Sequence, residues 1–342
     1  MRVSMVAAII HRARWNFNVD AADGVSRRDS MRIVSLLPSA TEIVSALGLI
    51  EALVGVTHEC DYPPDVIGKP VLTASRIHGG GLTSTAIDHA VSTRLGGHQG
   101  LYTLDEALLR VLQPDLVPTQ ELCDVCAVSY TKVQQAARFL DTETRVVSLE
   151  PTTLEAVLDN ITLVSQLTGR EREGAELVAR LRARLIAVRA RLSTIRRRPR
   201  VWVCEWLDPP YAAGHWVSAQ VDWAGGQEVF ERLGLPSVRI RPEELVRAAP
   251  DVIVLAPCGF HIEAVEEEAA RTPFFQGWQE LPAVRAGAVW AVDASSYYSR
   301  PGPRLVDGVE QMARILHPEI FGAPDPATAQ RIPVPQDAPT RA

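Results

Sequence analysis

The chain has 342 residues, is 46% hydrophobic and carries a formal net charge of −6. This length indicates two domains or lobes, and the composition is typical of a globular protein. A nucleic-acid-binding surface normally needs a basic patch, so the acidic balance argues against that class. Five cysteines are too few, and an odd number, for a disulfide framework. We therefore expect reduced thiols and a cytoplasmic location.

The two ends of the chain are expected to lie outside the folded part. The apolar segment 3–10 precedes basic residues, which reverses the order of a secretory signal, so we expect no signal peptide. Residues 1–30 are predicted to be a disordered N-terminal extension, with Met1 and Met31 both open as the start residue. Residues 322–342, rich in Pro and Ala, are predicted to be a disordered tail. No apolar run is long enough to span a membrane.

The first half of the chain alternates strand and helix signals. Segment 32–37 predicts a buried strand, and Ser39 with Glu42 three residues later predicts a capping box that starts a helix ending near Gly48. A strand at 52–57, a helix at 104–112 and strands at 116–117 and 145–149 follow. This order is typical of a parallel α/β lobe, which we place at residues 31–153.

The middle and second half repeat this plan after a helical region. Helices are predicted at 154–167 and 171–197, the second with a solvated arginine face, and form a helical linker region at 154–198. Strands at 201–206, 251–256 and 288–292 then form a C-terminal α/β lobe at 199–321. Each half contains a helix end, Pro-Asp and a buried strand, at 111–117 and at 247–254, which is a weak internal repeat.

Chemically informative side chains gather where strands end, the edge at which parallel sheets bind ligands. Aromatic rings with a few polar groups suit a large, flat or partly apolar small molecule. The candidate ligand-binding residues are Ser39, Thr41, His58, Glu59, Tyr62, Gln120, Glu205, Trp206, Tyr211, His215, Trp216, Phe260, Tyr298 and Arg300. The candidate metal ligands at these ends are Cys60, Cys123, Cys126 and Cys258, because thiolates and imidazoles suit a soft metal.

Several long motifs occur in an order that resembles one protein family. They are RIVSLLPSATEIVSALGLIEALVGVTHECDYP, TQELCDVCAVS, EWLDPPYAAGHW, PCGF, GWQELPAVRAGAVWAVD and SRPGPRLVDG. Over residues 31–320 the chain resembles the periplasmic binding proteins for cobalamin and iron–siderophores, and within them a cobalamin-binding-like branch. The resemblance implies an α/β fold in which two Rossmann-like lobes are joined by a long helical backbone. It also implies a ligand cleft between the lobes and delivery of a corrinoid, haem or ferric chelate to an ABC importer permease.

Three interpretations of the strand-end cysteines stay open at this point. Cys123 and Cys126 are two small buried side chains, or a redox pair, or ligands of zinc or an iron–sulfur cluster together with Cys60 and Cys258 and with His58 or His215. Either of these histidines is suited to be an axial ligand of corrinoid cobalt or haem iron.

Three functions follow. The first is a monomeric, non-enzymatic binding protein for a cobalamin-like corrinoid or related metal tetrapyrrole or ferric chelate. The second is a metal- or cluster-binding protein. The third is a hydrolase or transferase that uses the same cleft, although the common nucleophile-elbow, P-loop and zinc-protease motifs are absent from the sequence.

Overall fold

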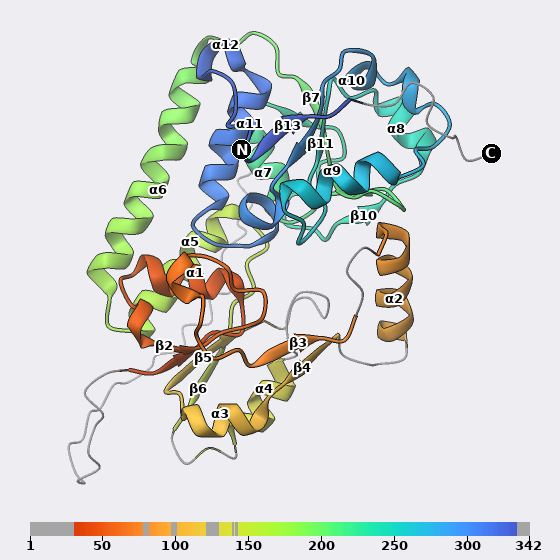
Figure 1. Ribbon diagram of the computed structural model, residues 1–342. Helices are drawn as coiled ribbons and strands as arrows, with labels where there is room; N and C mark the ends of the chain where they lie inside the picture. Colours follow the sequence, from red (N-terminus) through yellow and green to blue (C-terminus); the bar gives the residue numbers. More distant parts are fainter. Residues whose placement is uncertain are drawn as a thin grey trace, which may run out of the picture. The chain divides into compact units, whose positions relative to one another are not determined.

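The computed structural model describes residues 31–77, 82–96, 101–120, 130–138, 140 and 143–333. Its first sheet has the strand order β2-β1-β5-β6, and all neighbouring strands are parallel (Figure 1). These strands are β1 (Ile33–Val34), β2 (Leu53–Gly55), β5 (Leu116–Thr119) and β6 (Arg145–Ser148). An antiparallel pair, β3 (Thr73–Ser75) and β4 (Tyr102–Leu104), forms a separate small sheet.

The helices of this half are α1 (Pro38–Ala46), α2 (Ser84–Gly96), α3 (Glu106–Leu112) and α4 (Tyr130–Ala137). The predicted capping box is wrong. Helix α1 begins at Pro38, whose fixed φ and missing N–H suit the first helical turn, and Leu37 is the N-cap without a side-chain bond. Glu42 instead lies buried and pairs with Arg304 far along the chain. Asp105 does cap α3, accepting from the backbone of Leu108 at 2.8 Å.

The second sheet has the strand order β10-β8-β7-β11-β12-β13, and β9 also pairs with β7. Its parallel centre consists of β7 (Arg200–Trp206), β11 (Val252–Leu255) and β12 (Val289–Val292), with β9 (Gln227–Glu228) parallel to β7. The antiparallel strands are β8 (Tyr211–Ala212), β10 (Val238–Arg239) and β13 (Ala329–Arg331). Its helices are α7 (Val217–Trp223), α8 (Pro242–Ala248), α9 (Ile262–Arg271), α10 (Pro282–Arg285), α11 (Leu305–Leu316) and α12 (Pro318–Phe321).

The predicted disordered tail is partly wrong. Strand β13 lies inside it and pairs antiparallel with β12, so that Ala329 faces Val292 and is buried. The Pro- and Ala-rich composition hid this short edge strand, because its order comes from pairing rather than from its own apolar pattern.

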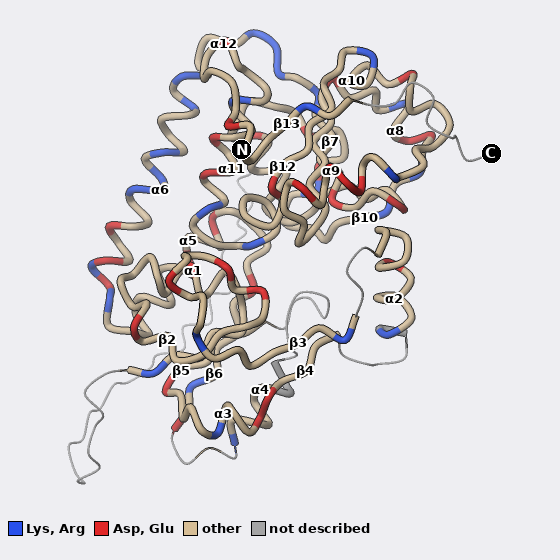
Figure 2. The backbone as a smooth tube through the Cα atoms, in the orientation of Figure 1, with Lys and Arg blue, Asp and Glu red and all other residues tan. Residues whose placement is uncertain are grey.

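Helices α5 (Leu154–Leu167) and α6 (Glu171–Arg191) lie between the two sheets in sequence. Their apolar faces, with Ile161 and Leu181, belong to the same buried cluster as Ile33 of the first sheet and Val203 of the second. The opposite face of each sheet has its own smaller cluster. The helices are therefore part of a shared core, and arginines dominate the outer face of α6 beyond its acidic first turn (Figure 2). Within the described ranges, no helix has the length and hydropathy of a membrane span.

Candidate functional site

An ionic cluster joins loops of the two sheets. Asp61, in the loop after β2, accepts from both terminal nitrogens of Arg300, which follows β12, and the Nη2–Oδ2 distance is 3.0 Å. Arg300 also donates to the backbone oxygen of Glu59 at 3.0 Å. His261, which follows β11, places Nε2 3.1 Å from Asp61 and Nδ1 3.1 Å from Asp293. We call Asp61, His261, Asp293 and Arg300 the interlobe network.

The interlobe network shifts the proton affinities of its members. Hydrogen bonds to Asp293 and Asp61 raise the pKa of His261 to about 9, so its imidazole is cationic at neutral pH. Burial opposes ionisation of Asp61, but His261 and Arg300 together hold its pKa well below the usual range. A cationic imidazole has no free lone pair, so His261 serves as an ion-pair partner and not as a metal ligand.

A second pair of charges lies beside this network. Arg304 donates to both carboxylate oxygens of Glu42 at 3.0 and 2.6 Å, and only 2% of the Glu42 side chain is exposed. Burial raises the pKa of Glu42, and the bidentate arginine opposes that rise. The Arg304 guanidinium also lies 4.1 Å from the ring centre of Tyr62. The predicted ligand residue Tyr62 therefore packs against Arg304, and it remains 44% exposed.

His215 is a half-buried imidazole whose pKa is lowered by burial. Its backbone has φ +52°, an uncommon value for a residue with a Cβ, and its N–H donates to Leu235 at 2.6 Å. The ring stacks on Trp216 at 5.6 Å, and no described residue forms a hydrogen bond with its nitrogens. Because neutral imidazole is the form that ligates metals, His215 is available for coordination at neutral pH.

His58 is the second histidine with an accessible ring. Its Nδ1 lies 2.7 Å from Thr73 Oγ1, while Nε2 lies 3.9 Å from Glu59, whose side chain is 43% exposed. The ring packs against Tyr102 with centres 5.6 Å apart, and Tyr102 donates to Glu59 at 3.4 Å. Both members of the predicted His58–Glu59 pair therefore lie at the surface of the first sheet's loops.

The Trp206 indole connects loops from both halves. Its Nε1 donates to the backbone oxygen of Ser84 at the start of α2, at 3.1 Å, and its ring meets Phe260 edge-on at 5.6 Å. Helix α2 is also bound by Glu268 of α9, whose carboxylate accepts from Ser84 N–H at 2.6 Å, and by Asp208, which accepts from Thr85 at 2.5 Å. Trp206 and Phe260 thus meet beside a contact between the N-terminal half and the second sheet.

The remaining polar predictions are less accessible. Ser39, Thr41 and Gln120 are buried. Glu205 is half-buried and accepts from the backbone N–H of Gly214 at 3.2 Å, and burial raises its pKa. Tyr211 is half-buried with a raised pKa, again through burial.

Two predicted ligand residues lie in the hydrophobic core instead. Trp216 is 8% exposed and donates to the backbone oxygen of Tyr298 at 2.7 Å. Tyr298 is 2% exposed and donates to Gln311 at 2.8 Å. Each polar atom is satisfied inside the protein, so these rings position their neighbours rather than present a surface to a ligand.

The cysteines do not gather in the described residues. Cys60 lies 3.1 Å from Thr41 Oγ1 and 3.2 Å from Thr57 Oγ1, and burial raises the pKa of its thiol. Cys258 is exposed. Among the residues that the structure describes, no three His, Cys, Asp or Glu side chains are grouped to hold a metal. Cys123 and Cys126 lie outside the described residues, so the cysteine-ligand hypothesis stays a prediction that Cys60 and Cys258 do not support.

The sequence analysis did not select Asp61, His261, Asp293 and Arg304. The first two stand inside the quoted THECDYP motif and directly after PCGF. Their position in or beside the quoted motifs was the sequence signal that could have selected these two residues.

Comparisons with known proteins agree with this architecture. A family model described as "Periplasmic binding protein" matches residues 33–295. The vitamin B12-binding protein of Vibrio cholerae is 27% identical over 83% of this chain and 88% of its own length. An uncharacterized ABC transporter substrate-binding lipoprotein, YvrC of Bacillus subtilis, is 26% identical over 87% and 84%. The periplasmic heme-binding protein BhuT, solved with two hemes, aligns with a TM-score of 0.62 and 25% identity over 84% and 98%.

These findings correct the predicted location and fix the family. The cytoplasmic location is wrong, because the family is periplasmic and a matched relative is a lipoprotein. That prediction relied on the low, odd number of cysteines, which does not determine the compartment, and on residues 1–30, which lie outside the described ranges. The fold prediction is confirmed: two α/β lobes are joined by long helices. The family model covers most of the folded part, and the chain belongs to the periplasmic binding protein family.

Proposed function

We propose that this protein captures a cobalt corrinoid, or a related metal tetrapyrrole or ferric chelate, without chemical turnover, and delivers it to an ABC importer permease. The named relatives support this ligand class, since one binds vitamin B12 and another was solved with heme. Their family supports a binding role rather than catalysis.

The observation that carries the proposal is His215. Its imidazole is neutral at pH 7 because burial lowers its pKa, and it has no hydrogen-bonding partner among the described residues. A rigid stack on Trp216 fixes the ring plane, and Trp216 is itself anchored by Tyr298. We propose that His215 coordinates the metal of the bound ligand on one axial face. His58, with Nδ1 held by Thr73, is the alternative axial ligand.

The interlobe network has a supporting role in this proposal. Asp61 of the first lobe and Arg300 and His261 of the second are already paired, so these charges hold the two lobes together beside the ligand site. Trp206, Phe260 and Tyr62 supply the apolar surface against which a flat macrocycle packs.

Absorption titrations test the proposal with three probes: aquocobinamide, which leaves axial positions open, haemin, and ferrioxamine B as a ferric chelate whose ligand is not a macrocycle. We expect saturable binding of a macrocycle with a shift of its visible bands. His215→Ala should weaken binding by roughly tenfold or more, about 1.4 kcal/mol, and abolish the axial-ligand shift. His89→Ala, an exposed histidine on α2, is the matched control.

Two results would contradict parts of the proposal. If the complexes of His215→Ala and His58→Ala both show the visible bands of the wild-type complex, neither histidine is the axial ligand. The ligand class would still stand. Failure of all three probes to bind folded wild-type protein would overturn the ligand class itself.

A further inference from the structure

Helix α2 belongs to the first lobe in sequence, but its first turn lies on the second lobe. The helix stands between β3 and β4 along the chain. Near its C-terminal end, Arg94 donates to the backbone oxygen of Arg76, which directly follows β3, at 3.0 Å. At its other end, Ser84 and Thr85 form hydrogen bonds with residues of the second lobe. The helix therefore reaches from one lobe to the other.

An ion pair on α9 holds the start of α2. Glu268, whose side chain is 1% exposed, accepts from the Ser84 N–H at 2.6 Å and from Arg271 Nε at 2.6 Å. Arg271 also donates from Nη2 to the backbone oxygen of Leu82 at 2.9 Å. Burial opposes ionisation of Glu268, but hydrogen bonds from Ser84 and Arg271 hold its pKa below the usual value. Because the first N–H groups of a helix lack partners within it and its positive end attracts anions, this carboxylate stabilises the first turn of α2 from the second lobe.

One face of α2 lies against two predicted ligand residues. Trp206 donates from Nε1 to the backbone oxygen of Ser84 at 3.1 Å. One turn further along α2, Asp88 lies close enough to Tyr211 for its charge to act, after burial, in raising the pKa of the phenol. Residues four apart share one face of a helix, so Ser84 and Asp88 are on the same side of α2. That side is directed at the segment 206–211 of the second lobe.

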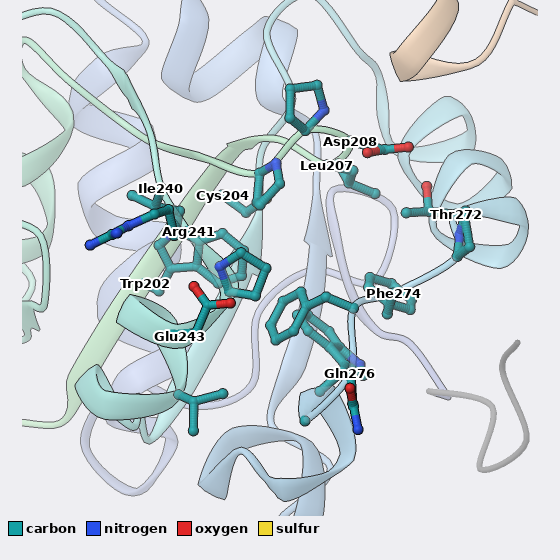
Figure 3. Close-up of a pocket in the computed structure, with 18 of the residues that line it drawn as sticks. Trp202, Cys204, Leu207, Asp208, Ile240, Arg241, Glu243, Thr272, Phe274 and Gln276 are labelled. Atoms are coloured by element: carbon teal, nitrogen blue, oxygen red, sulfur yellow. The ribbon is translucent and has the colours of Figure 1, made fainter. Parts of the chain in front are cut away.

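The contact is polar and confined to the first turn of α2. Among the described side chains of this helix, only that of Ser84 is buried, and exposed Thr85 donates to Asp208 at 2.5 Å. A pocket of about 770 Å³ in the second lobe has Asp208 and Thr272 on one side (Figure 3), yet no described residue of α2 lines it. Helix α2 therefore rests on the second lobe through hydrogen bonds and inserts no apolar face there. A contact of this kind opens without exposing a hydrophobic core, as is typical of the mobile elements beside binding sites.

We propose that α2 is a lid over residues 206–211 of the second lobe, and that Glu268 and Arg271 hold this lid closed. Ligand reaches Trp206 and Tyr211 after the first turn of α2 leaves its partners, and the turn returns once the ligand is bound. This inference rests on the proposed function only in taking these two residues as ligand contacts. A lid that must open for both entry and exit controls both rates and leaves the affinity nearly unchanged.

Hydrogen exchange measures release of the lid without any ligand. The Ser84 amide and the Trp206 indole N–H both donate across the contact, so NMR exchange rates of the two groups report its opening. Glu268→Gln removes the negative charge and one acceptor oxygen. We expect both N–H groups to exchange roughly tenfold faster or more, because a hydrogen bond to a charged group is lost. Glu267→Gln, at an exposed acid on the same helix, is the matched control and should exchange as wild type does.

Thr85→Val tests the same contact from the side of α2 and leaves the second lobe unaltered. It removes the hydrogen bond to Asp208 from an exposed side chain. Both N–H groups should then exchange about 2- to 10-fold faster, the range for one net hydrogen bond. Thr93→Val, at another exposed threonine of α2, should have no such effect. Melting temperatures confirm that each variant is folded.

Ligand kinetics connect release of the lid to binding. In stopped-flow absorption with aquocobinamide and haemin, we expect Glu268→Gln and Thr85→Val to raise the association and dissociation rate constants by the same factor. That factor should match the acceleration of hydrogen exchange in the same variant. The Kd should stay within about twofold of the wild-type value, because both rate constants rise together.

Three outcomes would overturn the proposal. Equal hydrogen exchange in wild type and both variants would show that these contacts do not hold α2. Faster exchange with unchanged ligand kinetics would show that α2 is released without controlling access. Faster dissociation with unchanged association would show that the variants weaken ligand contacts instead. If neither macrocycle binds the wild type, the proposed function fails, whereas joint acceleration of the Ser84 and Trp206 signals would still support a lid over Trp206.

Discussion

Glu228 gives the clearest prediction of pH dependence. It lies in β9, where burial raises the pKa of its carboxyl from 4.5 to about 8. Neither oxygen meets a donor in hydrogen-bond geometry among the described residues, and nearby backbone amides offset only part of the burial effect. Between these two pKa values the folded state binds a proton that the unfolded state has released. Stability therefore falls as pH rises from about 4.5 to 8.

The magnitude follows from the two pKa values. Between pH 6 and pH 9 the loss attributable to Glu228 is at most about 2.7 kcal/mol, a figure good only to order of magnitude. Glu228→Gln removes the ionisable group, so the free energy of unfolding should depend less on pH by about 2–3 kcal/mol over that interval. Burying the glutamine amide has a cost that does not depend on pH. It lowers the free energy of unfolding equally at pH 6 and pH 9 and does not change the difference between them.

Urea unfolding at pH 6 and pH 9 measures the effect. Glu263→Gln, at an exposed acid on α9 that does not contribute to the pKa shift of Glu228, is the control and should keep the wild-type pH dependence. Equal pH dependence in Glu228→Gln and wild type would refute the reasoning. It would show that Glu228 is ionised in the folded protein at neutral pH.

Further predictions concern the lobe contacts and the last strand. Asp61→Asn should lower the pKa of His261 below about 9, which NMR titration measures, and should reduce the free energy of unfolding by about 1–2 kcal/mol. The control Asp65→Asn, at an exposed residue, should change neither quantity. Because that histidine's pKa is raised, its contribution is complete below about pH 6.5 and lost as pH passes 9. Glu42→Gln should lower the free energy of unfolding, measured in urea, by about 3–5 kcal/mol. A decrease of less than about 1 kcal/mol would contradict a buried ion pair between Glu42 and Arg304. Ala329→Asp should lower the melting temperature by several degrees and exposed Ala327→Asp should not; equal effects would contradict a buried β13.

The alternation of strands and helices was predictable from the sequence because each apolar period is a local property. The strand at 33–34, the helix at 154–167 and the strand at 252–255 all appear where the pattern placed them. The helix start near Ser39 was predicted to within one residue, but the partner of Glu42 was not predictable from local rules. Glu42 fits a capping box by spacing, yet its partner is Arg304, 262 residues away.

The site was predictable in composition and only partly in geometry. Strand-end position selected His58, His215 and Trp206, which remain accessible or bridge the lobes. The same rule also selected Tyr298, which faces inward because its hydroxyl finds Gln311. Spacing along a chain cannot show which side of a loop faces the core. It also cannot show that Asp61 meets His261 and Arg300 from the other lobe, since that pairing exists only in the folded protein.

The measurement that tests the central claim most directly is the absorption titration of purified wild-type protein and His215→Ala with aquocobinamide and haemin at pH 7. The account predicts saturable binding of at least one macrocycle by the wild type, with shifted visible bands that His215→Ala loses. Wild-type protein that is folded yet leaves both spectra unchanged would contradict it.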